Sequence, residues 1–140
     1  MTYSIRQVEL VGGYIDSIEE MDRTCFPFDE MLPFDGSWWW VAFDEDDVPV
    51  GYAGLAHLWG DRGFLCRVGV LPKARGNGLQ RKFVRARQRG ARGLEFSRIV
   101  TYTDRKNVVS SNNLIRCGYS LYRPTYEWGT SGALYWYRDL

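Results

Sequence analysis

The sequence predicts one mixed α/β domain. Its apolar residues change between strand-like alternation and helix-like spacing, in the order strand, helix, loop, three strands, helix, strand, helix and two strands. The chain has 140 residues, of which 45% are hydrophobic, and this is enough for a single core. No internal repeat or linker interrupts the order. We therefore expect one domain over residues 1–140.

The composition excludes several protein classes. No apolar run approaches the roughly 20 residues that a membrane-spanning helix needs. The first ten residues lack the basic and apolar segments of a secretory signal. One histidine and three separated cysteines, Cys25, Cys66 and Cys117, give neither a disulfide framework nor a zinc ligand set. We expect a cytoplasmic protein without a metal and without membrane association.

In the first half of the chain, alternating, aromatic or β-branched segments predict strands, and helical spacing of apolar residues with acidic residues opposite predicts a helix. The expected strands are 2–9, 38–43, 50–59 and 64–71, and the expected helix is 12–25. Residues 25–34 contain two prolines among aromatic residues, which is incompatible with a long regular element, and we expect a loop there.

The second half begins with a helix over 76–92 whose solvent side is expected to be cationic. The basic residues assigned to that side are Arg81, Lys82, Arg85, Arg87, Arg89 and Arg92. A strand over 97–103 and a helix over 107–117, closed by Gly118, follow. Strands 119–128 and 133–138 are expected to form a hairpin through the Gly-rich turn 129–132.

Charge is divided unequally along the chain, although the net charge is only +1. Residues 1–61 contain 13 acidic and two basic residues, whereas residues 62–140 contain four acidic and 16 basic ones. A field of one sign concentrates ligands of the other sign. The division indicates a phosphate-bearing ligand for the basic part and a cationic one for the acidic part, or simply two solvated faces of different charge.

The segment between the strand 64–71 and the helix 76–92 has the composition of an anion site. Gly76 and Gly78 allow the backbone to approach a ligand and to present successive N–H groups. The helix N-terminus adds partial positive charge, and Lys73, Arg75 and Arg81 add full charges. The spacing fits neither the dinucleotide-binding nor the P-loop pattern. The segment could also be an ordinary strand–turn–helix connection.

Two motifs resemble those of the GNAT family of N-acetyltransferases. Lys73-Ala-Arg-Gly76-Asn-Gly78 is similar to the Arg/Gln-x-x-Gly-x-Gly/Ala signature, and Val70 and Pro72 precede it as in the family. The downstream helix motif of the family is matched at Asn107, Ser110, Gly118 and Tyr119. The resemblance implies a mostly antiparallel sheet of about seven strands, with a splay between the fourth and fifth strands and about four flanking helices.

The resemblance also implies acetyl-CoA as co-substrate. In the family, amides of the Gly-rich turn hold the pyrophosphate, and the splayed strand and the second helix contact the pantetheine arm. The positions that match are Val68, Gly69, Val70, Arg75, Gly76, Asn77, Gly78, Leu79, Gln80, Arg81, Asn107 and Ser110.

The chemistry departs from the family pattern at one position. Many members carry a proton-donating tyrosine seven residues after the motif asparagine, where this chain has Leu114. Tyr102, five residues before Asn107, is the first candidate for a substitute, and His57 is the second. Cys66 is a third candidate, in the role of a nucleophile, and the fourth hypothesis is a reaction that needs no single acid.

The resemblance places the loop 25–34 over the acceptor, a small-molecule or peptide amine. Its candidate acceptor-binding residues are Phe26, Phe28, Asp29, Glu30 and Phe34, and Met31 and Leu32 add to its apolar character. A non-catalytic acyl-CoA-binding or regulatory module, and a nucleic-acid-directed protein using the helix 81–92, are the competing hypotheses for the function. The chain is expected to be a monomer, or a homodimer paired through its aromatic C-terminal strands.

Overall fold

The computed structural model describes residues 2–30 and 34–140. The strands are β1 (Ser4–Val8), β2 (Ser37–Phe43), β3 (Pro49–His57), β4 (Arg62–Val70), β5 (Arg98–Thr103), β6 (Ser120–Tyr122) and β7 (Leu134–Asp139). The helices are α1 (Tyr14–Cys25), α2 (Leu79–Gly93) and α3 (Val108–Arg116), together with one 3-10 turn, η1 (Pro72–Ala74). The expected order of elements is confirmed, with three α-helices and this turn in place of about four helices.

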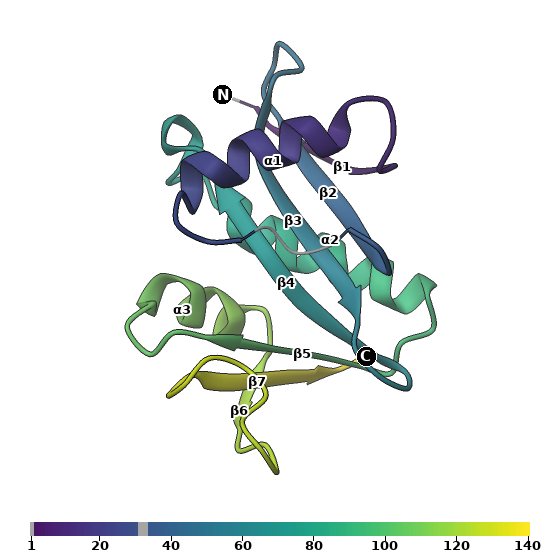
Figure 1. Ribbon diagram of the computed structural model, residues 1–140, viewed down its shortest axis with the longest axis vertical. Helices are drawn as coiled ribbons and strands as arrows, with labels where there is room; N and C mark the ends of the chain where they lie inside the picture. Colours follow the sequence, from purple (N-terminus) through teal and green to yellow (C-terminus); the bar gives the residue numbers. More distant parts are fainter. Residues whose placement is uncertain (1, 31–33) are drawn as a thin grey trace.

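All seven strands form one sheet in the order β1-β2-β3-β4-β5-β7-β6 (Figure 1). Every neighbouring pair is antiparallel except β4 and β5, which run parallel. This arrangement confirms the predicted mixed sheet, which is mostly antiparallel.

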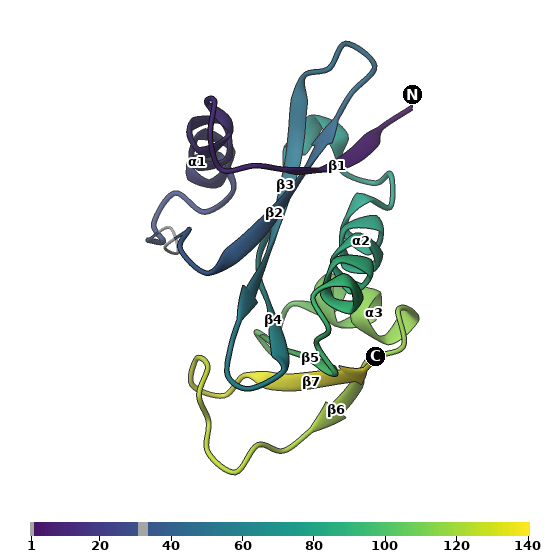
Figure 2. The ribbon, with the colours of Figure 1, turned by 90° about the vertical axis from the view of Figure 1, so that its right-hand side faces the viewer.

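Helices cover the sheet on both faces, α1 on one side and α2 with α3 on the other (Figure 2). Successive residues of β2 are divided between the two cores because strand side chains alternate. Trp39 packs with Ile18 and Met21 of α1, and Trp40 packs with the core below α2. The sheet is therefore the middle layer of three.

The predicted splay between the fourth and fifth strands is confirmed. β4 and β5 are paired only where Arg62–Phe64 meets Arg98–Val100. Just beyond this pairing, the Thr101 hydroxyl donates to the Leu65 carbonyl at 2.8 Å. From there the two strands diverge (Figure 1), and the edge of β4 that faces β5 is left without a strand partner.

A β-bulge lies in β4 just after the end of this pairing. Ala53 of β3 pairs with Val68 and Leu55 pairs with Leu65, so Cys66 and Arg67 both lie opposite Gly54. A bulge re-aims the side chains of the strand that contains it. Here it displaces the alternation of β4 at the point where β4 leaves β5.

The predicted strand over 119–128 is wrong in length, since β6 ends at Tyr122. Pro124 follows closely and has no N–H to donate to a ladder. The connection to β7 is accordingly longer than the four-residue turn expected from the glycines at 129 and 132.

Two charged residues lie on faces that the sequence analysis assigned to solvent. Asp22 is only 3% exposed although acidic residues were expected opposite the apolar side of α1, and Arg87 is only 2% exposed. Each stands four residues after a buried apolar residue, Ile18 and Phe83, and so shares its helical stripe. The cationic surface of α2 is correspondingly smaller than predicted.

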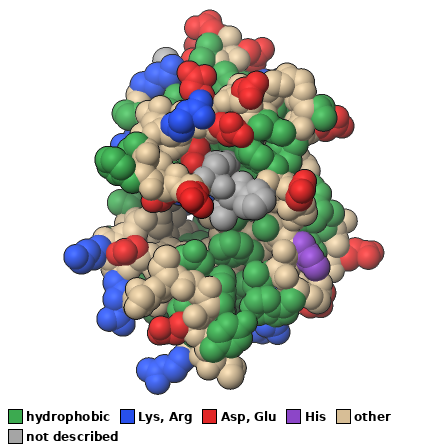
Figure 3. All heavy atoms as spheres, viewed as in Figure 1, with side chains coloured by type: hydrophobic (Ala, Val, Ile, Leu, Met, Phe, Trp, Pro, Cys, Tyr) green, Lys and Arg blue, Asp and Glu red, His purple; other side chains and the backbone are tan. Residues whose placement is uncertain are grey.

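No helix among the described residues combines the length and apolarity required to cross a membrane. In Figure 3, acidic side chains are spread over the upper half of one face, where α1 and the β2–β3 turn lie. The lower half of that face, over β5 and β7, is largely hydrophobic. Acidic side chains therefore gather on the part of this face that the first half of the chain forms.

Gly90 and Gly93 both lie in α2, but only Gly90 is packed against another element. A Cβ at Gly90 would lie 2.5 Å from a ring atom of Trp40, whereas no atom of the described residues is within 4 Å of one at Gly93. We expect Gly90→Ala to lower the free energy of unfolding by about 1–3 kcal/mol, because overpacking outweighs the gain in helix propensity.

Gly93→Ala is the matched control and should leave the free energy of unfolding unchanged or raise it by up to about 1 kcal/mol. Urea unfolding followed by tryptophan fluorescence measures both variants. Equal stabilities would contradict the contact between Trp40 and α2.

Candidate functional site

A cavity of about 910 Å³ opens where β4 and β5 separate. Residues from β4 and β5 line it, together with residues from the start of α2, from α3 and from the C-terminal end of α1. Among the described residues, no group of three or more His, Cys, Asp or Glu side chains is placed to hold a metal ion.

The turn before α2 supplies backbone donors to one end of the cavity. Gly76 and Gly78 line it and have φ angles of +82° and +71°, which a side chain would strain. No side chain caps α2 at Gly78, and the first N–H groups of a helix have no acceptor within it. Arg75 and Arg81 line the same cavity. This end is suited to an anion.

The unpaired edge of β4 supplies further backbone groups. The Leu71 N–H donates to the Val50 carbonyl of β3 at 2.8 Å. Because backbone groups alternate along a strand, those of Val70 and Val68 point away from β3 and into the splay. The Val70 carbonyl is taken by Arg75 Nε at 2.9 Å, while both N–H groups face the cavity.

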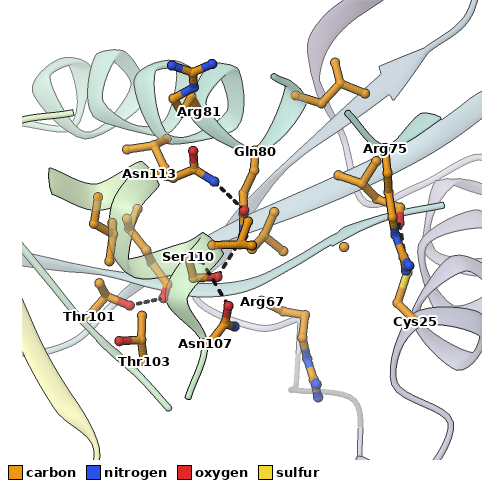
Figure 4. A pocket seen from close by; sticks show the side chains of 18 of the residues that line it. Cys25, Arg67, Arg75, Gln80, Arg81, Thr101, Thr103, Asn107, Ser110 and Asn113 are labelled. Atoms are coloured by element: carbon orange, nitrogen blue, oxygen red, sulfur yellow. Dashed lines mark hydrogen bonds between the residues drawn. The ribbon is translucent and has the colours of Figure 1, made fainter. Parts of the chain in front are cut away.

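A side-chain network joins α2 to α3 across the cavity (Figure 4). Gln80 Nε2 donates to Ser110 Oγ at 2.9 Å, and Asn113 Nδ2 donates to Gln80 Oε1 at 2.6 Å. Asn107 is the N-cap of α3, and its Oδ1 accepts from the Ser110 N–H at 3.1 Å. These hydrogen bonds fix α3 against the first turn of α2.

Arg67, placed by the bulge in β4, connects the cavity to the loop after α1. Its Nε lies 3.5 Å from Asp22 Oδ1 and its Nη1 lies 3.0 Å from Asp29 Oδ2. Its Nη2 donates to the Glu30 carbonyl at 2.6 Å, and its guanidinium lies 4.6 Å from the ring centroid of Phe26. One side chain therefore holds both α1 and residues 26–30 beside the cavity.

Tyr52 of β3 extends the contacts of Arg67 and Asp22, because its buried hydroxyl donates to Asp22. Burial and the neighbouring Asp22 carboxylate raise the pKa of Tyr52 above its ordinary value. The ring of Tyr52 also covers Gly69, where a Cβ would lie 2.5 Å from a ring carbon. Asp22 thus receives a hydrogen bond from β3 and an ion pair from β4.

Two cysteines line the cavity, and both favour the neutral thiol. Burial raises the pKa of Cys25, whose Sγ lies 3.7 Å from the Val70 carbonyl oxygen. Burial also raises the pKa of Cys66. Because the thiolate is the nucleophilic form, this environment does not activate Cys66 as a nucleophile.

Comparison with known proteins identifies the family. The family model described as "Acetyltransferase (GNAT) family" matches residues 5–119, which include both sequence motifs, all but the first residue of β1, and every later element to the end of α3. The chain belongs to this family. No curated protein sequence matches the chain.

Solved GNAT structures share the fold at low sequence identity. A Bacillus subtilis acetyltransferase in complex with CoA has a TM-score of 0.80 and 14% identity, covering 99% of each chain. An IAA acetyltransferase from Bacillus cereus ATCC 14579 has a TM-score of 0.78 and 14% identity, covering 99% of this chain and 100% of its own. The ribosomal-protein-S18-alanine N-acetyltransferase of Escherichia coli has a TM-score of 0.78 and 12% identity, covering 99% of this chain and 94% of its own.

The residues predicted to bind CoA are brought together, with one exception. The cavity is lined by Val68, Gly69, Val70, Arg75, Gly76, Gly78, Leu79, Gln80, Arg81, Asn107 and Ser110. Asn77 does not line it, because its side-chain amide donates to the carbonyls of Ala74 and Arg75 at 2.9 and 3.1 Å and so stabilises the turn.

The two predicted catalytic residues have different locations. Tyr102 lines the cavity and stacks on Phe64, with ring centroids 5.8 Å apart. His57 does not line it, since it lies at the end of β3, where its Nε2 is 2.7 Å from the Gly60 carbonyl oxygen and its ring stacks on Phe96. Leu114, at the position of the family tyrosine, is a buried part of the cavity wall.

The predicted acceptor residues are also divided. Phe26 lines the cavity, and the Asp29 carboxylate is neutralised by Arg67 at its edge. Phe28 is 97% exposed, and Phe34 packs against Trp39, with ring centroids 5.2 Å apart. Glu30 contributes its backbone carbonyl to Arg67.

Met31 and Leu32 lie outside the described residues.

Sequence reasoning missed Arg67, Arg87 and Asn113, which also line the cavity. For the two arginines the available signal was a charge within an apolar stripe or strand, which is costly unless it is paired.

Arg67 is expected to be the residue on which the Asp22 network depends. Arg67→Gln would leave the buried Asp22 carboxylate without its cation, and we expect the free energy of unfolding to fall by about 3 kcal/mol. Arg62→Gln, also in β4 but without an ion pair among the described residues, is the control.

Urea unfolding of Arg67→Gln, Asp22→Asn, the double variant Arg67→Gln/Asp22→Asn and the control Arg62→Gln measures the coupling. The double variant should recover part of the loss. Additive effects of the two substitutions would rule out the ion pair as a stabilising contact.

Proposed function

We propose that this GNAT chain transfers an acetyl group from acetyl-CoA to a primary amine, by direct attack within a ternary complex. The observation that supports this most strongly is the cavity that joins the uncapped N-terminus of α2 to the unpaired edge of β4. An anion site at one end and free backbone donors along one wall suit a carrier with a phosphate head and an amide-containing arm.

The residues of the cavity divide the binding of the carrier among them. The N–H groups of Gly76, of Gly78 and of the first turn of α2, with the side chains of Arg75 and Arg81, would hold the pyrophosphate. The N–H groups of Val68 and Val70 would bind carbonyl groups of the arm. Asn107 uses its Oδ1 as the helix cap, which leaves its Nδ2 to donate to the arm from the other side.

The reaction requires a neutral amine, because only the free electron pair attacks the thioester carbon. The N–C bond forms, the carbonyl oxygen gains negative charge, and the C–S bond then breaks with its electron pair on sulfur. A backbone N–H of β4 at the splay is our candidate donor to the oxyanion. Tyr102 is our candidate for the group that returns a proton to sulfur, since its phenol lines the cavity.

The acceptor is a small-molecule or peptide amine that would approach from the side of Phe26 and α1. The acidic residues on that half of the face attract a protonated amine before it binds (Figure 3). The related structures are named for an IAA acetyltransferase and for a ribosomal-protein-alanine acetyltransferase at equal TM-scores of 0.78, so the fold does not select the acceptor.

A non-catalytic CoA-binding module is the second candidate function. Leu114 favours it, because a buried leucine in the cavity wall cannot donate a proton. The two functions share the carrier site and differ only in turnover.

An acetyl-transfer assay separates the two. We expect acetyl-CoA with a panel of small amines, polyamines and N-terminal peptides to release free thiol in proportion to amine acetylation, detected with a thiol reagent and by mass spectrometry. CoA binding by calorimetry without thiol release on any acceptor would instead support the non-catalytic module.

The glycine turn can be tested with a matched pair of variants. Gly76 and Gly132 both have positive φ, +82° and +71°, and no atom of the described residues lies within 4 Å of a Cβ built at either. Both substitutions to valine therefore carry similar backbone strain, but only Gly76 lines the cavity.

We expect Gly76→Val to weaken CoA binding about tenfold or more, a loss of about 1.4 kcal/mol or more. Gly132→Val should bind CoA as the unsubstituted protein does. Isothermal titration calorimetry measures both, and equal affinities in the two variants would remove the turn from the carrier site.

A further inference from the structure

Arg87 of α2 is a buried cation without an anionic partner. It is only 2% exposed, and it forms no salt bridge with any residue from 2–30 or 34–140. Its Nε donates to the Phe83 carbonyl at 3.2 Å and its Nη1 to the Gly54 carbonyl at 3.0 Å. Nη2 has no hydrogen bond within the described chain. A buried charge is costly unless an anion approaches it.

The Arg87 side chain lines the cavity at the point where β4 leaves β5. Gly54, whose carbonyl it binds, lies opposite Cys66 and Arg67 at the bulge, and a Cβ at Gly54 would lie 2.5 Å from Cys66 Sγ. Arg87 and Cys66 line the same cavity. The guanidinium is therefore at the closed end of the splay.

The open end of the cavity lies about the length of the pantetheine arm away from Arg87. Arg87 is eight residues beyond Leu79, about 12 Å along the α2 axis. Along β4, Val70 and Cys66 are four residues apart, about 13 Å. The pantetheine arm is a chain of about 13 atoms, equal to about four extended residues or ~14 Å. An arm whose phosphates lie at Gly76 and Gly78 ends with its sulfur near Arg87.

The same end of the cavity lacks the usual proton donor. Leu114 of α3 lines it, 5% exposed, together with Val84 and Leu65. Tyr119 follows α3, but its buried hydroxyl has no partner among the described residues and does not line the cavity. The sulfur would thus leave beside a cation, and not beside the tyrosine phenol that many family members carry at the position of Leu114.

We infer that Arg87 stabilises the thiolate of CoA as it leaves, and this inference rests on the proposed transferase function. When the C–S bond breaks, its electron pair stays on sulfur, and the Arg87 guanidinium offsets that charge without losing a proton. The proton given up by the attacking amine passes to solvent or through Tyr102 and reaches the sulfur afterwards. No oxidant, reductant or further reactant is needed.

The groups around Arg87 leave it charged. Burial lowers its pKa to about 10, and the titratable groups near it are Cys66 from β4, Cys117 at the end of α3 and Tyr119. Burial raises the pKa of all three, so they are neutral near pH 7. Arg87 is then the charged member of this group when the thiolate forms.

The test measures the thiol of bound CoA in the unsubstituted protein. The test compares the pKa of the bound thiol with that of free CoA, because an adjacent cation lowers a pKa by about 1–3 units. We expect the ultraviolet absorbance of the thiolate to titrate at least about one unit lower in bound than in free CoA. CoA affinity should therefore rise with pH between these two values, whereas the affinity of S-methyl-CoA should stay constant.

Variants assign the effect to the guanidinium. Arg87→Gln is expected to remove the downward pKa shift and to slow acetyl transfer about tenfold or more, and Arg87→Lys should retain part of the shift. Arg89→Gln removes an exposed charge from the same helix and is the matched control. Tyr102→Phe should slow transfer without moving the pKa of the bound thiol, because it changes no charge.

Two results would overturn the inference: a bound thiol that titrates no lower than free CoA, or an unchanged shift in folded Arg87→Gln. The first needs no variant, so it holds even where Arg87→Gln fails to fold. Absence of CoA binding by the unsubstituted protein would instead remove the proposed function itself, and calorimetry with S-methyl-CoA recognises that case separately.

Discussion

The separation of two parallel strands is the constraint from which the rest of the site follows. β4 and β5 share only three paired positions, so the remaining backbone groups of β4 need other partners. Thr101 takes the first carbonyl, Arg75 takes the Val70 carbonyl, and the amides between them face a cavity. A sheet with this gap is stable because helices pack on both faces and the bulge at Cys66 and Arg67 redirects the strand.

Much of the fold could be predicted from the sequence because its periodicity is local. The two glycines of the carrier turn and the cap at Asn107 are also local features, and the structure brings them to one cavity. Asp22 and Arg87 were misplaced because helical spacing locates a side chain on a stripe but does not say whether a charge there finds a partner across the sheet. The distance of His57 from the cavity could not be predicted, because neighbouring strands do not reveal which end of a hairpin faces the splay.

The proposed acceptor side depends on contacts that no short segment contains. Arg67, Asp22 and Tyr52 come from β4, α1 and β3, and their hydrogen bonds and ion pair exist only once the bulge has formed. The aromatic rings around Tyr102 likewise come from distant segments, with Trp128 5.4 Å and Tyr135 6.1 Å away between ring centroids. The shape of this side is therefore set by tertiary contacts, which the sequence patterns do not contain.

The bridge from Gln80 to Ser110 and Asn113 has an evolutionary consequence. The two helices line the proposed carrier site from opposite sides, and this one amide sets the spacing between them with a donor and an acceptor. Replacing any of the three residues alone leaves a polar group of a half-buried side chain without its partner. The positions are thus coupled: descendants of this sequence should exchange them as a set, and covariation among 80, 110 and 113 would record that the helix spacing is under selection.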